Sequence, residues 1–166
     1  MPGPPSGAHP GAMSAFTVRR LRPGDEGALE YVAREETDFT DEAPSPPLAP
    51  ADARAYLSDP HVWHWHAEDD SGQPVGFLMA YVHRQRHGSA LHVMFDEIGV
   101  REAWRRRGVG RALLAALHGQ MREAGIGEVW VLADNPEAQA FYEACGYEVD
   151  ELQGVMLTRE VSDRSE

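Results

Sequence analysis

The strongest chemical signal in the sequence is a short run rich in arginine and glycine. It reads Arg105-Arg106-Arg107-Gly108-Val109-Gly110-Arg111. It stands where a strand is expected to end and a long helix to begin. Backbone N–H groups at a helix start point outward at the positive end of the helix dipole, and glycines without a Cβ let a phosphate approach closely. We therefore predict a pyrophosphate-binding loop; the alternative is a glycine-containing helix cap beneath a solvated arginine cluster.

Two other phosphate-binding motifs do not fit this run. The dinucleotide fingerprint needs G-x-G-x-x-G followed by an acidic residue, and the P-loop needs a lysine. The chain contains no lysine, and its glycine spacing departs from the fingerprint. Both motifs are therefore excluded for this loop.

A second motif begins at Asn135 and ends at Tyr147. It reads N-P-E-A-Q-A-F-Y-E-A-C-G-Y, which is typical of a short helix with proline in its first turn and glycine after its end. Together with the run from Arg105 to Gly110, it resembles the GNAT superfamily of acetyl-CoA-dependent N-acetyltransferases, whose patterns are Q/R-x-x-G-x-G/A and N-x-x-A-x-x-F/L-Y-E-x-x-G-F/Y. The segment from Phe95 to Val100 stands where that family has an E-D-L-A-V-like strand. The resemblance covers Phe16 to Val161.

The resemblance implies a site for acetyl-CoA. Backbone groups of one strand would hydrogen-bond the pantetheine arm, the arginine–glycine loop would bind the pyrophosphate, and the second motif would contact the pantetheine side. The residues with these expected roles are Ile98, Gly99, Val100, Arg105, Arg106, Arg107, Gly108, Val109, Gly110, Arg111, Asn135 and Tyr142. Acetyl-CoA is thus expected as the co-substrate, and no metal is expected.

The same resemblance implies direct transfer, with Tyr142 as the general acid that protonates the departing CoA thiolate. A core tyrosine on an amphipathic helix is the alternative, although Phe141 fits that role better. The acceptor amine attacks only with a free lone pair, so a carboxylate base is expected, and Glu97 and Asp96 are the candidates. Adjacent strand residues point to opposite faces, so we expect only one of them, preferably Glu97, to face the acetyl group. A backbone N–H between Ile98 and Val100 would stabilise the oxyanion.

Histidines cluster in the pattern H-x-x-H-x-H from His61 to His66. In a strand, His64 and His66 would share one face, as zinc ligands can. Tryptophans alternate with them, which is typical of a half-buried strand, and no further Cys or His stands at a spacing that completes a zinc site. We therefore predict no metal site here. Of the later histidines, only His92 lies near the expected site, where it is an alternative base.

The chain is acidic, with a net charge of −12 and a pI of about 5.0. Such a chain repels nucleic acid and anionic lipid, so neither is expected as a partner. One cysteine and no apolar run of membrane-spanning length predict a cytoplasmic protein without internal disulfides. Cys145 is expected to be a buried structural thiol, because no base stands beside it.

The charge is unevenly distributed along the chain. Acidic residues concentrate between Gly24 and Asp70, and basic residues between Arg101 and Arg111, where they are expected to bind CoA phosphates. In the superfamily, the region that corresponds to residues 30–59 lines the acceptor cleft. An acidic cleft would favour a polycationic amine such as an aminoglycoside, a polyamine or a basic peptide; a solvated acidic surface is the alternative. The candidate amine-binding residues are Glu35, Glu36, Asp38 and Asp134.

Short segments within Pro74–Val82, Phe95–Val100 and Val131–Asp134 resemble the GNAT-type aminoglycoside 3-N-acetyltransferases, the gentamicin-resistance group. This resemblance implies 3-N-acetylation of an aminoglycoside, hence antibiotic resistance, by a homodimer. The chain departs from the group at Asp96-Glu97, where the group has Y-D, and at Asn135-Pro136, where it has a longer insert. Acetylation of a protein or peptide amine is an alternative function, and a CoA-binding module without catalysis is another.

The elements that must position these residues follow from the periodicity of apolar residues. Strands are expected at 15–22, 61–67, 74–84, 90–100, 129–133, 147–152 and 155–160, and helices at 25–34, 51–58, 109–124 and 136–145. The predicted fold is the α/β GNAT fold, with a mixed sheet of about seven strands and about four helices in the order β-α-α-β-β-β-α-β-α-β-β.

The predicted organisation is a single N-acetyltransferase domain over residues 14–161. A leader rich in proline and glycine precedes it at 1–13 and is expected to be disordered, with Met13 as an alternative start. A flexible tail is expected at 162–166.

Overall fold

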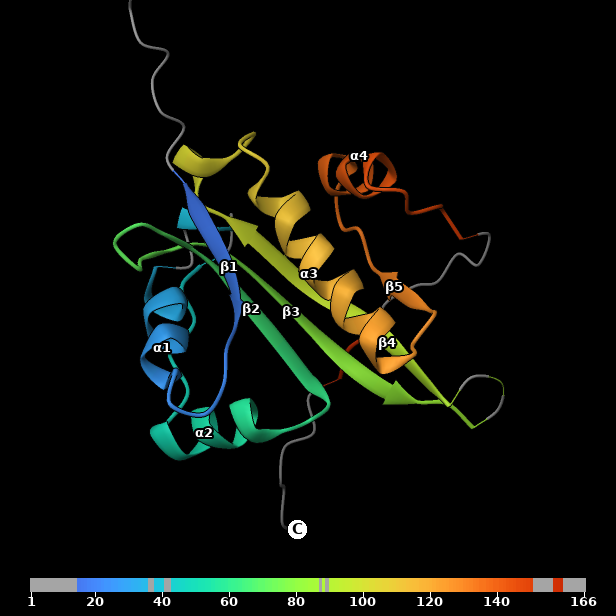
Figure 1. Ribbon diagram of the computed structural model, residues 1–166, viewed down its shortest axis with the longest axis horizontal. Helices are drawn as coiled ribbons and strands as arrows, with labels where there is room; N and C mark the ends of the chain where they lie inside the picture. Colours follow the sequence, from blue (N-terminus) through green and yellow to red (C-terminus); the bar gives the residue numbers. More distant parts are fainter. Residues whose placement is uncertain are drawn as a thin grey trace, which may run out of the picture. The chain divides into compact units, whose positions relative to one another are not determined.

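The described strands form one mixed sheet in the order β1-β2-β3-β4-β5 (Figure 1). The structure is a computed structural model that describes residues 15–35, 38–40, 43–86, 88, 90–150 and 157–159. The strands are β1 (Phe16–Arg20), β2 (Val62–Asp69), β3 (Pro74–Arg84), β4 (Leu91–Val100) and β5 (Val129–Val131). Neighbouring strands from β1 to β4 are antiparallel, whereas β4 and β5 are parallel. The predicted mixed α/β sheet is therefore confirmed.

The four predicted helices are present. They are α1 (Glu26–Arg34), α2 (Pro50–Ser58), α3 (Val109–Ala124) and α4 (Pro136–Ala144), and the 3-10 helix η2 (Glu102–Trp104) precedes α3. The chain divides into two units, residues 1–132 with the sheet and α1 to α3, and residues 133–166 with α4. Within the described ranges, no helix has both the length and the apolar character needed to span a bilayer.

One face of the sheet packs against α3, which contacts β1, β2, β3 and β4 (Figure 1). The helix buries an apolar stripe that includes Leu113 and Leu117. It begins after Gly108, whose φ of +85° is a left-handed conformation that glycine adopts at little steric cost. In β3, a Cβ on Gly76 would lie 2.8 Å from Cγ1 of Val109, so the missing side chain lets the helix approach the sheet.

The opposite face of the sheet packs against α1 and the segment that follows it. Phe77 of β3 is buried with Val32 of α1 and with Phe39. Gly99 of β4 lies beneath the same cluster, and a Cβ on it would be 2.5 Å from Cε1 of Phe77. This face therefore carries the segment between α1 and β2 in which the acceptor cleft is expected.

Two predicted C-terminal strands are not observed. Residues 147–150 and 157–159 form no strand, while 151–156 and 160 lie outside the described residues, as do the predicted leader at 1–13 and tail at 162–166. The predicted count of about seven strands is thus corrected to five for the described part of the chain. Alternating apolar residues form a strand only where a neighbour satisfies their backbone groups, and no described strand pairs with these residues.

Candidate active site

The two candidate bases lie at a bulge in β4. Glu97 is opposite Met79 of β3, whereas Phe95 is opposite the next residue of β3, so Asp96 is an extra residue in the ladder. A bulge breaks the strict alternation of side chains along a strand. Burial, followed by the charges of Asp96 and Glu97, raises the pKa of Tyr81, so both carboxylates lie near that hydroxyl. The expectation that only one of the two carboxylates, preferably Glu97, faces the acetyl group stays a prediction.

The strand that carries these bases continues beyond its pairing with β5. Pairing ends at Phe95 and Val131, but β4 runs on to Val100. Along residues 96–100, no described strand covers the edge of β4 that faces away from β3. Backbone groups at an uncovered edge can add an extended ligand as a further strand. This edge includes Ile98, Gly99 and Val100, for which the family resemblance implies contact with pantetheine.

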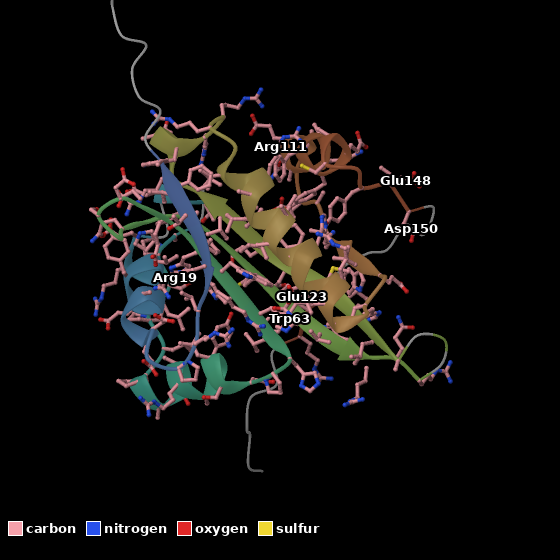
Figure 2. All side chains as sticks on the ribbon, viewed as in Figure 1. Arg19, Trp63, Arg111, Glu123, Glu148 and Asp150 are labelled. Atoms are coloured by element: carbon pink, nitrogen blue, oxygen red, sulfur yellow. The ribbon has the colours of Figure 1, made fainter. Side chains whose placement is uncertain are left out.

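The arginine–glycine loop connects η2 to α3. Arg106 has a φ of +61° and Gly108 a φ of +85°, and these two left-handed residues turn the chain into the helix. A Cβ on Gly108 would meet nothing within 4 Å, so the space beside it is open. The remaining arginines, Arg105, Arg107 and Arg111, are exposed, and Arg111 projects from the first turn of α3 (Figure 2). Open backbone N–H groups and positive charge together suit an anion, so this loop fits the phosphates of acetyl-CoA.

Arg101 is not part of this anion site. Its Nη1 donates to Oδ2 of Asp38 at 2.9 Å, and its Nη2 donates to Oη of Tyr31 at 2.6 Å. Its Nε donates to the carbonyl of Pro74 at 2.9 Å, and its guanidinium lies 4.8 Å from the ring centre of Phe39. The expectation that the whole basic stretch binds phosphate is therefore wrong for Arg101, which ties the segment after α1 to the end of β4.

Among the described residues, five acids between Gly24 and Asp70 are paired with arginine. The ion pairs are Asp25–Arg19, Glu68–Arg19, Glu30–Arg34, Glu26–Arg54 and Asp38–Arg101, with N–O distances between 2.7 and 3.2 Å. Arg19, which bridges two of the acids, projects from β1 (Figure 2). Exposed pairs of this kind stabilise the fold by little, but they reduce the negative field that a cationic substrate meets.

The four candidate amine-binding residues have different surroundings. Glu35 is exposed at the C-cap of α1, and Asp38 is paired with Arg101. Asp134, in the second unit, is exposed and accepts a hydrogen bond from Nδ2 of Asn135 at 2.8 Å. Glu36 lies outside the described residues. Asp38 is therefore already neutralised by a partner of its own, which weakens its case as an amine ligand.

The histidines of β2 lie where the alternation predicts, but the strand is buried on both faces. Trp63 (Figure 2) and Trp65 lie on the face of the sheet that α3 covers, and the guanidinium of Arg20 lies 5.6 and 5.8 Å from their ring centres. His64 and His66 face the opposite side and are also buried, with ring centres 5.1 Å apart. The description of β2 as a half-buried strand is therefore wrong. In the described ranges, no three His, Cys, Asp or Glu side chains form a cluster that could hold a metal.

Burial keeps both of these imidazoles neutral. It lowers the pKa of His64 well below its usual value, and burial followed by the charge of Arg19 lowers the pKa of His66 to about 4. Among the described residues, neither ring nitrogen of His66 has a hydrogen-bond partner. A neutral, unpartnered imidazole at this position makes folding sensitive to acid.

We expect the free energy of unfolding to fall by about 2 kcal/mol between pH 7 and pH 5 through His66 alone. The unfolded state takes up a proton at about pH 6.5, whereas the folded state excludes it until about pH 4. The stabilisation is thus complete above pH 6.5 and is lost as the pH falls toward 4. Urea denaturation of the wild type and of His66→Leu checks this. An equal loss of stability in both proteins would show that His66 does not cause it.

The second unit places its predicted residues around α4. Asn135 is the N-cap, and its Oδ1 accepts a hydrogen bond from the backbone N–H of Ala138 at 2.8 Å. Tyr142 is buried, with its ring centre 5.8 Å from that of Tyr147, whereas Phe141 is only half-buried. The interpretation that Phe141 is the better core residue is therefore wrong. The backbone N–H of Tyr147 donates to the carbonyl of Tyr142 at 3.0 Å, and this turn brings the two rings together.

Cys145 at the C-cap of α4 is half-buried rather than buried. The prediction of a fully buried thiol is therefore corrected. Its position at the end of a short helix, where the chain turns at Gly146 with a φ of +91°, explains the partial exposure.

Two tyrosines near the candidate bases were not singled out from the sequence. Tyr56 of α2 lies with its Oη 3.0 Å from Nδ1 of His64, and its interaction with Tyr81 of β3 is among the causes that raise its pKa. Both tyrosines occupy positions that satisfy the apolar periodicity of their elements, which hides their polar ends. The usable signal is that a buried tyrosine hydroxyl normally finds a hydrogen-bond partner. A tyrosine that occupies an apolar position of the pattern therefore still carries a hydroxyl that needs a hydrogen-bond partner.

The fold of this chain is similar to that of solved acetyltransferases. A solved aminoglycoside acetyltransferase from an uncultured soil metagenomic sample, in complex with sisomicin, has a TM-score of 0.75 to this chain. It is 21% identical and covers 89% of this chain and 97% of its own. At this identity the likeness establishes the fold.

The chain belongs to the acetyltransferase (GNAT) family, whose model matches residues 29–147. The aminoglycoside N(6')-acetyltransferase type 1 of Stenotrophomonas maltophilia is 31% identical to it over 83% of this chain and 90% of that protein. The D-amino-acid N-acetyltransferase HPA3 of Saccharomyces cerevisiae is 27% identical over 82% of this chain and 88% of that protein. The predicted family and the predicted acetyl-CoA-dependent N-acetyltransferase activity are confirmed.

Proposed function

We propose that the protein acetylates a primary amine of a cationic small molecule of the aminoglycoside class. The observation that carries this proposal is the pair of carboxylates, Asp96 and Glu97, that the bulge in β4 brings near the hydroxyl of Tyr81. Two adjacent negative charges attract an ammonium group, and either can take its proton before attack. The names of two compared proteins, both aminoglycoside acetyltransferases, support the same substrate class.

In the proposed reaction, the acceptor amine loses a proton to Asp96 or Glu97, and its nitrogen attacks the thioester carbonyl. A backbone N–H between Ile98 and Val100 stabilises the oxyanion. The new C–N bond forms, the C–S bond breaks, and Tyr142 gives its proton to the thiolate. The nitrogen then loses its second proton, which returns through solvent to the Tyr142 phenolate. The uncovered edge of β4 and the loop at the start of α3 bind the donor.

A free amino acid is a second candidate acceptor, because one relative is named as a D-amino-acid N-acetyltransferase. An amino acid carries its own carboxylate close to the reacting nitrogen. The charges of Asp96 and Glu97 repel that carboxylate, whereas they attract every amine of a polycation. The site therefore favours the polycation.

A panel of acceptors tests this function. Purified protein is given acetyl-CoA with kanamycin-type and gentamicin-type drugs, spermidine, D-amino acids or basic peptides, and thiol release is followed. We expect the highest kcat/KM with an aminoglycoside. The highest value with a peptide would indicate protein acetylation instead. CoA binding without thiol release from any amine would indicate a non-catalytic module.

The position of acetylation is part of the same test. The resemblance of short apolar segments to the aminoglycoside 3-N-acetyltransferases implies the 3-N position, whereas the Stenotrophomonas relative is named for the 6' position. NMR of the purified product distinguishes the two nitrogens. We propose the 3-N position, and a product acetylated at 6' would overturn that part of the proposal.

Neutralising Glu35 and Glu36 is expected to weaken acceptor binding. Glu35→Gln combined with Glu36→Gln should raise the KM for a polycationic amine about threefold, because two long-range attractions are lost. The KM for acetyl-CoA should not change. Asp38 is not replaced, because its loss would remove the ion-pair partner of Arg101. Asp70→Asn, an exposed acid in the turn after β2, is the matched control. If the double variant behaves like this control, the acidity of the segment serves only solvation.

We further propose a homodimer in the cytoplasm, with a single domain over residues 14–161. Light scattering of the purified protein measures its mass in solution. A monomer mass across the working concentration range would contradict the dimer.

A further inference from the structure

A chain of polar side chains connects the buried interior of the sheet to the candidate bases. Nδ1 of His64 in β2 lies 3.0 Å from Oη of Tyr56 in α2. Met79 of β3 is opposite both His64 in β2 and Glu97 in β4, and Tyr81 lies two residues further along β3 on the same face. Tyr56 interacts with Tyr81, and the charges of Asp96 and Glu97 act on both tyrosines. Polar groups are costly to bury without a hydrogen bond; in the described part of the chain Nε2 of His64 has no such partner, whereas Nδ1 lies against Tyr56. His64, Tyr56 and Tyr81 take no part in the proposed reaction.

The three side chains of the network are neutral at neutral pH. Burial lowers the pKa of His64 well below its usual range, and burial raises the pKa of Tyr56 and of Tyr81. Each hydroxyl therefore has one hydrogen to donate, and the imidazole carries one hydrogen, on either Nδ1 or Nε2. The network thus has two possible directions, set by the tautomer of His64.

The nearby carboxylates favour one of these directions. If Nδ1–H of His64 donates to Tyr56, then Tyr56 donates to Tyr81, and the hydroxyl hydrogen of Tyr81 is left to point toward the carboxylates. If Nδ1 instead accepts from Tyr56, then Tyr81 donates to Tyr56 and turns its lone pairs toward those negative charges. The first direction aligns both O–H dipoles with the field of Asp96 and Glu97, and the second opposes it.

We propose that His64 is a positioning residue whose Nδ1–H orients the hydroxyls of Tyr56 and Tyr81 toward Asp96 and Glu97, and so fixes the polar surface that receives the acceptor amine. The inference deepens the proposed function and rests on it, because it assigns the amine to these carboxylates. His64 does not exchange a proton with the substrate, because its buried imidazole stays neutral. It acts through two hydroxyls that it holds in one orientation.

The tautomer of His64 is the direct test. In ¹⁵N-labelled protein, NMR distinguishes a protonated from an unprotonated ring nitrogen, and the signals of His64 are assigned as those missing from His64→Asn. We expect hydrogen on Nδ1 and a bare Nε2, which is the less common tautomer of free histidine. Hydrogen on Nε2 with a bare Nδ1 would overturn the proposal.

Kinetics on the full-length protein give an independent test. His64→Leu removes the donor and should raise the KM for the amine about tenfold, the effect of losing one oriented hydrogen bond, with little change in the KM for acetyl-CoA. His64→Asn places an amide N–H in the position of Nδ1–H and should restore most of the amine affinity. Tyr56→Phe breaks the network from the other side and should match His64→Leu, which keeps the test decisive if the leucine variant folds poorly.

His66→Leu is the matched control. His66 lies two residues away on the same face of β2 and is equally buried, but it is outside the network. It should leave both KM values unchanged. If His66→Leu raises the KM for the amine as much as His64→Leu does, the effect is one of packing and the proposal is wrong. The same conclusion follows if His64→Asn gives no restoration.

The proposed acetylation and the positioning role of His64 can be disproved separately. If no amine in the panel is acetylated, the proposed function falls, and the tautomer of His64 still decides whether the network has the inferred direction. If an aminoglycoside is acetylated but Nε2 carries the hydrogen, the function stands and the positioning role falls.

Discussion

The double variant Asp96→Asn with Glu97→Gln is expected to lower kcat/KM at about pH 7 by about 10²- to 10⁴-fold, the usual contribution of a general base. At that pH the acceptor amine is protonated, and only its free lone pair attacks the thioester. Both carboxylates lie near Tyr81, so either can take the proton when the other is replaced. Each single variant should therefore lose much less activity than the double variant.

The loss should shrink as the pH rises, because the amine then loses its proton to water without help. Thiol release measured between about pH 7 and about pH 9.5 checks this dependence. Glu102→Gln, which neutralises an exposed carboxylate just after β4, is the control and should leave the profile unchanged. A loss of equal size at every pH would assign Asp96 and Glu97 to substrate binding rather than to proton transfer.

Elements whose signals are local could be predicted from the sequence. The range of α3 was predicted without error, because an apolar stripe with 3.6-residue periodicity lies between Gly108 and Gly125, which both adopt positive φ values. The hairpin between β2 and β3 also has a local cause. The carboxylate of Asp69 accepts hydrogen bonds from the backbone of Ser71 and Gln73, and Gly72 has a φ of +81°.

Features that depend on a neighbouring strand could not be predicted in this way. The bulge at Asp96 exists only in the register between β3 and β4, and strict alternation along β4 alone placed the two carboxylates on opposite faces. The predicted C-terminal strands were wrong in their described residues for the same reason. An alternation of apolar and polar residues is compatible with a strand. A strand forms, however, only where a neighbouring strand completes its backbone hydrogen bonds.

The role of charged residues was the least predictable part of the site. Local counting assigned Arg101 to the donor phosphates and the acids before β2 to the acceptor. The fold instead pairs Arg101 with Asp38, 63 positions earlier in the chain, and bridges Asp25 and Glu68 through Arg19. The carboxylates whose charges act on Tyr81 are instead two neighbours in the chain, Asp96 and Glu97. Ion pairs between residues far apart in the chain therefore decide which charged side chains can bind a substrate.

The variant Tyr142→Phe is expected to lower kcat by about 10²- to 10³-fold while the KM for acetyl-CoA changes little. A thiolate that leaves without a proton donor is a poor leaving group, whereas donor binding uses the β4 edge and the loop before α3. The phenyl ring keeps the contacts of the tyrosine ring with Phe141 and Tyr147, so the aromatic packing of α4 is retained.

Tyr147→Phe is the matched control for this variant, because its ring is part of the same buried cluster and burial raises the pKa of its hydroxyl to about 12. It removes one phenol from the same unit without removing the expected acid, so kcat should be unchanged. Steady-state thiol release and thermal unfolding of both variants separate the two roles of Tyr142. An unchanged kcat in Tyr142→Phe would leave Tyr142 as a packing residue of α4, and the thiolate would then take its proton from water.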